Sequence, residues 1–224
     1  MKVLLPLLAP LFFVKSPAAA TLEEVLRLME SVGKTFRSFE AGFSQKKYTA
    51  VLDEFDMPET GEFLYSRARD GSALLRQEIT KPGTRILTIK GGVATVYQPR
   101  IKQAQVLSLG KNKDKAEYLV LGLGQSPAKL RETFQMEYLG AEKVGSVPCH
   151  VLALKPKAAA AAAYFTSITL WIDSSRGLPI QQRLQEPNGD YLLVNFSGIQ
   201  VNLKIPDSKF EQKLPADVQI QRIQ

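Results

Sequence analysis

The sequence predicts an α+β fold that is mostly β, with one large antiparallel sheet and few helices. Two observations support this prediction. From Gly42 onward, short runs rich in β-branched and aromatic residues are separated by Gly, Pro and Asp, which is typical of strands joined by tight turns. Before that point, apolar residues recur every three or four positions, which is typical of a helix with one apolar face.

The first twenty residues have the composition of a secretory signal peptide. Lys2 precedes an apolar run at 3–14, and small residues follow as far as Ala20. The run is shorter than a membrane-spanning helix requires, so we expect cleavage after Ala20 instead of a retained anchor. The chain would then begin at Thr21, without a cysteine to carry a lipid anchor, and residues 21–224 would form a single domain.

The first helix is predicted to begin at Thr21, because Thr21 and Glu24 have the spacing of a capping box. The apolar face of this helix is predicted to consist of Leu22, Val25, Leu26, Met29, Val32, Phe36 and Phe39.

Strands are predicted wherever β-forming runs lie between turn residues. Three turn sequences, at 90–92, 173–177 and 187–190, each separate two such runs and therefore indicate hairpins in a meander. The predicted strands lie at approximately 40–51, 60–68, 73–80, 84–90, 93–98, 103–108, 133–143, 147–155, 165–173, 179–185 and 190–202.

A second helix is predicted from Asn112 to Leu123, where a polar first turn precedes an apolar second half that Gly122, Gly124 and Pro127 would end. The six alanines at 158–163 are expected to form a loop or a single helical turn.

One face of so large a sheet must be buried, and the residues alone allow two arrangements. The two helices either pack tightly as an ordinary core or cover a curved sheet as a lid over an apolar cavity. Arg67 bears on this choice, because alternation places it on the same face as Phe63 and Tyr65. Its guanidinium could bind carbonyls at the end of a lid helix, or it could reach solvent from a strand end.

The order of several short motifs resembles the family of LolA-type periplasmic outer-membrane lipoprotein carriers. The resemblance covers nearly all of residues 21–224. The motifs are Phe36-Arg37-Ser38-Phe39-Glu40-Ala41-Gly42-Phe43-Ser44-Gln45, Gly61 to Arg67, Ile86-Leu87-Thr88, Gly91-Gly92, Tyr97-Gln98-Pro99, Gln105, Leu170-Trp171-Ile172-Asp173, Gly177-Leu178-Pro179, Pro187-Asn188-Gly189-Asp190, Phe196, Phe210 and Leu214-Pro215.

The resemblance implies a curved, incomplete β-barrel with an α-helical lid, enclosing a cavity for the acyl chains of lipoproteins. It assigns the lid latch to Arg67; because a proline commonly follows this arginine in the family, and Ala68 follows it here, Arg69 is an alternative. The cavity would be lined by Phe43, Phe63, Tyr65, Leu75, Ile86, Tyr97, Tyr118, Leu121, Phe134, Met136, Ile168, Leu170, Ile172, Leu192, Val194 and Phe196.

The resemblance also implies partners and a location. The protein would act in the periplasm as a monomer, receive acylated lipoproteins from an inner-membrane ABC-type transporter and deliver them to an outer-membrane receptor. It would need no cofactor and catalyse no reaction. Two alternatives remain open: a carrier of another lipid such as a glycolipid, or an envelope sensor on the same fold. We expect sensors to carry a further C-terminal domain, whereas this chain continues only about ten residues beyond Pro215.

Enzymatic functions are not favoured by the residues. His150 is the only histidine, and no Gly-x-Ser-x-Gly sequence is present for a hydrolase. Cys149, the only cysteine, adjoins His150, but neighbours on a strand point to opposite faces, so we expect a buried structural thiol and no disulfide. The acidic residues at 53–56 lack the spacing of a calcium loop, so no metal is predicted. Nucleotide-binding motifs are also missing.

Net charge does not indicate a nucleic-acid partner. The 29 Lys and Arg residues exceed the 22 Asp and Glu residues, giving a net charge of +7 that suits anionic head groups, an acidic partner or solubility. The lysines at 111, 113 and 115 are interrupted by Asp114 and Glu117. We therefore interpret them as the solvated start of a helix and expect no nucleic acid to bind.

Overall fold

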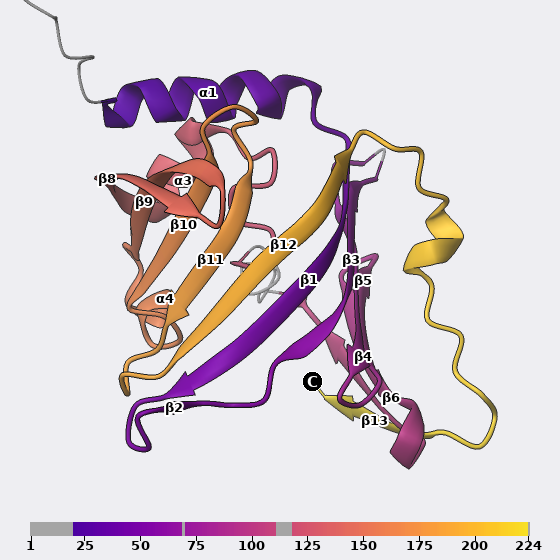
Figure 1. Cartoon of the computed structure of the whole chain (residues 1–224). Helices are drawn as coiled ribbons and strands as arrows, with labels where there is room; N and C mark the ends of the chain where they lie inside the picture. Colours follow the sequence, from indigo (N-terminus) through magenta and orange to yellow (C-terminus); the bar gives the residue numbers. More distant parts are fainter. Residues whose placement is uncertain (1–19, 69, 111–117, 224) are drawn as a thin grey trace, which may run out of the picture.

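The computed structural model describes residues 20–68, 70–110 and 118–223, and a single antiparallel sheet dominates it (Figure 1). The sheet order is β13-β7-β6-β5-β4-β3-β1-β12-β11-β10-β9-β8, with β2 paired to β1. All strand pairs are antiparallel except β13 with β7. The strands are β1 (Ser38–Thr49), β2 (Glu54–Phe55), β3 (Glu59–Arg67), β4 (Ala73–Lys81), β5 (Arg85–Lys90), β6 (Val93–Gln98), β7 (Gln103–Ser108), β8 (Phe134–Val144), β9 (Val147–Pro156), β10 (Ser167–Asp173), β11 (Pro179–Gln185), β12 (Tyr191–Val201) and β13 (Gln219–Ile223).

The sheet curves without closing, so β8 and β13 form its two edges in the described part of the chain (Figure 1). The prediction of a curved, mostly β fold is confirmed. Meander connections make most strands neighbours of the strand that follows them, which explains why turn chemistry located them well. β2 and β13 were not predicted, since both are short and neither has an apolar alternation of its own.

Helix α1 (Leu22–Thr35) lies across one end of the sheet (Figure 1). The predicted capping box is present, with the Thr21 hydroxyl accepting from the Glu24 amide and the Glu24 carboxylate accepting from the Thr21 amide. The prediction that Phe36 and Phe39 belong to this helix is wrong. Phe36 is already extended, and Phe39 lies in β1, where its ring packs edge-on against Phe63 and Phe196. Burial in the sheet overrides the helical spacing.

The second predicted helix can be tested only at its C-terminal end. Residues 111–117 lie outside the described residues, Tyr118 is helical, and residues 119–122 form turns, so the helix ends earlier than the predicted Leu123. Gly122 and Gly124 take positive φ angles of 79° and 67°, which end any helical run. A short helix, α3 (Pro127–Thr133), follows instead, capped by the Ser126 hydroxyl. The six alanines include the single-turn helix α4 (Ala159–Ala162), as expected.

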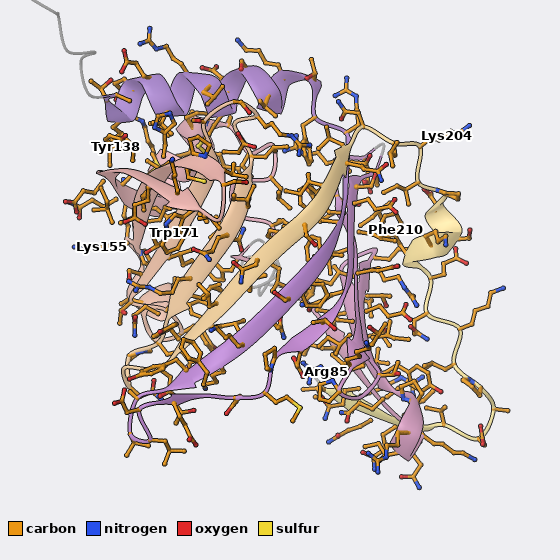
Figure 2. All side chains as sticks on the ribbon, viewed as in Figure 1. Arg85, Tyr138, Lys155, Trp171, Lys204 and Phe210 are labelled. Atoms are coloured by element: carbon orange, nitrogen blue, oxygen red, sulfur yellow. The ribbon has the colours of Figure 1, made fainter. Side chains whose placement is uncertain are left out.

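The main hydrophobic core fills the concave face between the sheet and α1. On the convex face, the segment after β12 crosses β3 to β6 (Figure 1). It contains the short 3-10 helix η3 (Asp207–Phe210), and Phe210 is buried against Leu64 and Leu74, between η3 and the sheet (Figure 2). We call residues 202–218 the C-terminal strap.

Candidate functional site

The candidate site begins at Arg67, the last residue of β3. Phe63 and Tyr65 are buried on the concave face, and alternation directs Arg67 toward the same side. The guanidinium Nη2 donates a hydrogen bond of 2.5 Å to the backbone carbonyl of Gly124. β3 and the segment 118–126 are thereby joined across the concave end of the sheet. Arg69, the alternative latch, lies outside the described residues.

Gly124 is held in place by close packing. Its φ of 67° favours glycine, and a Cβ atom here would lie 2.4 Å from the Phe36 ring. On its other side, a Cβ added to Gly33 of α1 would lie 3.2 Å from the Gly124 carbonyl oxygen. The accepting carbonyl therefore packs against Gly33 of α1 and against Phe36, between α1 and β1, which defines its position in this structure.

Two glutamine side chains form hydrogen bonds with backbone groups close to Gly124. Gln125 accepts from the Gly122 amide at 3.1 Å, and Gln182 of β11, which is buried, donates to the Leu121 carbonyl at 3.0 Å. Because these bonds satisfy buried backbone groups, the segment can run over an apolar core without secondary structure. We call residues 120–126 the lid segment.

A cavity of about 1120 Å³ lies beside this hydrogen bond. The hairpin turns β3–β4 and β5–β6, the end of β7, the end of α1 and the lid segment all border it. Its lining residues are Glu30, Gly33, Lys34, Tyr65, Arg67, Asp70, Gly71, Ser72, Ala73, Ile89, Gly91, Gly92, Ser108, Leu109, Gly110, Val120, Gly124, Gln125, Ser126 and Lys129.

The lining separates into an apolar wall and a charged rim. Tyr65, Ile89, Leu109 and Val120 are buried, whereas the charged residues Glu30, Lys34, Asp70 and Lys129 are exposed. Such a wall can remove hydrocarbon from water while polar groups of the same ligand stay at the rim. The arrangement therefore suits an amphiphile better than a fully polar or fully apolar molecule.

The predicted lining residues are distributed differently. Of them, Tyr65 lines this cavity. Two of them lie elsewhere: Ile86 and Tyr97 pack with Ala104 on the convex face, because β5 directs Leu87 and Ile89 inward instead. The prediction that Ile86 and Tyr97 line the cavity is therefore wrong. The other thirteen belong to or pack against the main concave core: Phe43, Phe63, Leu75, Tyr118, Leu121, Phe134, Met136, Ile168, Leu170, Ile172, Leu192, Val194 and Phe196.

Sequence reasoning missed most of the cavity rim. Gly91 and Gly92 were identified as a turn and as a family motif, and Gly33 and Lys34 only as part of a helix, but none of them as cavity residues. The available signal was the number of glycines at predicted strand ends, since several turns that share one end of a sheet can leave space between them. Neither the end of α1 nor Ser108 to Gly110 had a pattern that indicated a binding site.

Cys149 and His150 show no sign of nucleophilic chemistry. Cys149 is buried, as expected, and burial raises the pKa of its thiol, which disfavours the reactive thiolate. His150 Nδ1 instead lies 3.2 Å from the Tyr138 hydroxyl. Within the described residues, no group of His, Cys, Asp or Glu side chains is arranged to hold a metal ion. Over the same residues, no helix is sufficiently long and apolar to cross a membrane.

Comparison with known protein families identifies one family that matches most of the chain. A family model described as outer membrane lipoprotein carrier protein LolA matches residues 34–213. No curated protein sequence matches the chain.

Two solved structures share the fold at low sequence identity, and a third matches more weakly. An uncharacterised conserved protein from Thermus thermophilus has a TM-score of 0.55 at 13% identity, covering 90% of this chain and 98% of its own. MucB has a TM-score of 0.52 at 15% identity, covering 85% of this chain. This chain spans only 62% of the MucB chain. A LolA superfamily protein from Nitrosomonas europaea has a TM-score of 0.39 at 14% identity, covering 87% of this chain and 99% of its own.

Proposed function

The chain belongs to the LolA family of outer membrane lipoprotein carrier proteins, and we propose that it carries the acyl chains of lipoproteins from the inner to the outer membrane. The observation that carries this proposal is the hydrogen bond from Arg67 to the Gly124 carbonyl, beside a cavity that is lined by both apolar and polar residues. A hydrogen bond at this position joins the sheet to the lid segment, so it can couple the entry of cargo to the opening of the lid segment.

The coupling follows from competition for the same space. Acyl chains that push between the wall and the lid segment must move Gly124, and Arg67 then loses its acceptor. A charge-assisted hydrogen bond contributes about 1.5–3 kcal/mol when protected from water. Because Arg67 is exposed overall, we expect the lower value of about 1 kcal/mol here. This hydrogen bond thus favours the closed position of the lid segment enough to promote the release of cargo. Entering cargo can still open the lid segment, because the bias is small.

The energy available from the cargo is larger. Each methylene removed from water stabilises the complex by about 0.8 kcal/mol, so part of one acyl chain exceeds the contribution of the latch. The exposed charges at the rim leave the polar part of a cargo in contact with water. This division suits a carrier, because the polar portion of the cargo need not be enclosed.

Residues 1–20 are proposed to act as a signal peptide that directs residues 21–224 to the periplasm. There the protein would work as a monomer between an inner-membrane ABC-type lipoprotein-releasing transporter and an outer-membrane lipoprotein receptor. The family membership and the composition of the first twenty residues support this part of the proposal.

The test compares Arg67→Leu with the unchanged protein, both purified from the periplasm, by mass spectrometry of the lipids and acylated proteins that co-purify. We expect acylated lipoproteins on both. Without the Arg67 hydrogen bond, the closed state competes less well with bound cargo. The rate of cargo transfer to acceptor membranes should therefore fall about fivefold, which is the factor that about 1 kcal/mol implies. Arg67→Lys, which keeps the charge and a donor, should fall closer to the unchanged protein.

Other outcomes would change the proposal in defined ways. Free lipids without acylated proteins would indicate a carrier of a different lipid. Equal transfer rates for both variants would remove the latch role from Arg67 but leave the cavity. Neither lipid nor acylated protein on any variant would contradict the carrier function.

A further inference from the structure

A second apolar feature lies at the far end of β1 from the cavity (Figure 1). In the hairpin that joins β1 to β2 and β3, Val51 is 88%, Leu52 61%, Phe55 41% and Met57 72% exposed. These are four of the eleven large apolar residues that are exposed in the described chain. Their concentration within seven residues differs from the scattered exposure expected of a surface. We call these four residues the apolar tip.

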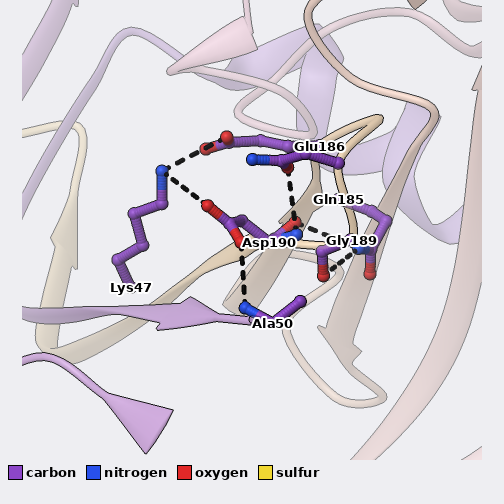
Figure 3. A network of polar contacts seen from close by, with 7 residues as sticks. Lys47, Ala50, Gln185, Glu186, Gly189 and Asp190 are labelled. Atoms are coloured by element: carbon purple, nitrogen blue, oxygen red, sulfur yellow. Dashed lines mark hydrogen bonds and ion pairs between the residues drawn. The ribbon is translucent and has the colours of Figure 1, made fainter. Parts of the chain in front are cut away.

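The apolar tip is held on a fixed base (Figure 3). Lys47 Nζ lies 3.2 Å from carboxylate oxygens of both Glu186 and Asp190, in the turn between β11 and β12. Asp190 also accepts from the Ala50 amide at 2.9 Å. Because Ala50 immediately precedes Val51, this network sets the direction of the tip, and little conformational entropy is lost when the tip binds something.

Aromatic rings, including that of Phe55 in the tip, form a layer on the sheet side of Val51 and Leu52. The rings of Tyr48, Phe55 and Tyr191 pack together with centroids 4.8 to 5.7 Å apart. Cations flank this layer: Lys46 Nζ lies 3.8 Å from the centre of the Phe55 ring, and the Arg183 guanidinium carbon lies 5.5 Å from that of Tyr191.

The hairpin also carries three exposed carboxylates, Asp53, Glu54 and Asp56. The Tyr48 hydroxyl donates to Asp53, so that side chain turns back from the tip. Glu54 pairs with Thr49 across the hairpin, one step beyond the pair Tyr48 and Phe55. Val51 and Leu52 lie in the turn of the hairpin, and the aromatic pair of Tyr48 and Phe55, with Lys46 over the Phe55 ring, lies further from the turn.

We propose that the apolar tip contacts the surface of a lipid bilayer. Apolar side chains followed by aromatic rings and then by cations match the change from hydrocarbon to head groups that a bilayer presents. A protein partner is less well supported, because a stable protein interface uses about 20–30 residues on each side and the hairpin offers far fewer. With so few inserted side chains, the contact would be weak and reversible.

The position of the tip is compatible with loading and release of cargo. β1 is twelve residues long, so roughly 40 Å separates the hairpin from the Arg67 end of the sheet. A bilayer contact at the hairpin leaves the cavity rim uncovered. The proposal does not depend on what the cavity binds, and the two can be tested separately.

The test uses residues 21–224, which contain every described helix and strand, with vesicles of phosphatidylethanolamine and a minor fraction of phosphatidylglycerol. In flotation, Val51→Ser combined with Leu52→Ser should reduce the bound fraction about tenfold, because both inserted side chains become polar. Leu139→Ser combined with Leu203→Ser is the matched control, since both residues are exposed apolar positions outside the hairpin. This control should bind as the unchanged protein does.

A fluorescence measurement locates the contact. Leu52→Trp in a Trp171→Phe background carries its only tryptophan at the tip, and its emission should shift to shorter wavelength when vesicles are added. Equal flotation of the tip variant and the control, or emission that vesicles do not change, would overturn the proposal. An emission shift produced by a purified envelope protein but not by vesicles would also overturn it, in favour of a protein site.

Discussion

The two halves of the sheet on either side of β1 and β12 are stabilised differently. In β9 and β10, the concave-face residues Leu152, Leu154, Ile168, Leu170 and Ile172 have no exposed surface and pack into the main core. In β3 to β7 both faces are covered, the concave face by the same core and the convex face by the C-terminal strap. The cavity borders this second half, along β4, β5 and the turns of β3–β4 and β5–β6.

The difference shows how one sheet can combine a stable scaffold with an open site. The β9–β10 half gains its stability from concave-face side chains that are fully buried. The β3–β7 half has part of its concave wall facing a cavity, and the strap supplies burial on its other side, through Phe210 and through Leu214 and Val218. Burial on the convex face thus compensates for space left on the concave face.

The largest expected effect is in the scaffold half. Leu170→Ala removes a side chain with no exposed surface, and the close packing around it cannot collapse fully, so unfolding should become easier by about 4 kcal/mol. Urea denaturation measures this change. Leu139→Ala, at a position that is 53% exposed, is the control and should change stability little. A cost near 1 kcal/mol for Leu170→Ala would mean that this half is not the rigid one.

A smaller effect is expected from the strap. Phe210→Ala should reduce stability by about 3 kcal/mol, because the ring is buried between Leu64 and Leu74. Hydrogen exchange should also quicken in residues 202–223, while amides of β9 and β10 remain protected. Uniform exchange across both halves would show that the strap is not a separate stabilising unit. Leu203→Ala, in the same segment but exposed, serves as the control.

The smallest effect concerns the junction between the hairpins of β1–β2 and β11–β12. The Ala50 amide, followed by Lys47 and Asn188, holds the pKa of Asp190 below its ordinary value. A lowered pKa stabilises the fold above the unfolded value of about 4 and loses that contribution as pH falls through the folded pKa. Asp190→Asn should therefore flatten the acid side of the stability profile.

Lys47→Met separates the two causes at this junction. It removes the cation but keeps the Ala50 hydrogen bond, which is the larger cause, so much of the acid dependence should remain. Thermal unfolding between neutral and acidic pH measures both variants. An acid profile of Asp190→Asn identical to that of the unchanged protein would show that this carboxylate is not the group responsible.

Much of the fold could be predicted from the sequence, because meander strands are separated by residues with clear turn chemistry. β5 and β6, for example, were located correctly around Gly91 and Gly92. The elements that were missed depend on distant partners. β13 forms only because β7 offers an unpaired edge, and α3 has a recognisable start at Ser126 and Pro127 but only seven residues.

The site was less predictable. Alternation placed Arg67 on the same face as Tyr65, and two partners were left open for it: carbonyls at the end of a lid helix, or solvent. In the structure it donates to the carbonyl of Gly124, which lies in a segment without helix. Which carbonyl, and which wall of the cavity, depends on how α1 meets the lid segment in space. For Ile86 and Tyr97, alternation identifies two faces but cannot say which is concave when the strap makes both apolar.

The parallel pairing of β13 with β7 also affects how the chain is made. Gln105 and Gln221 face each other in this pair although 116 residues separate them. During synthesis, β7 therefore remains an unpaired edge until residues 219–223 have been added. Exposed edges recruit strands from other chains, so a product that stops before Gln219 should aggregate more readily than one that includes it.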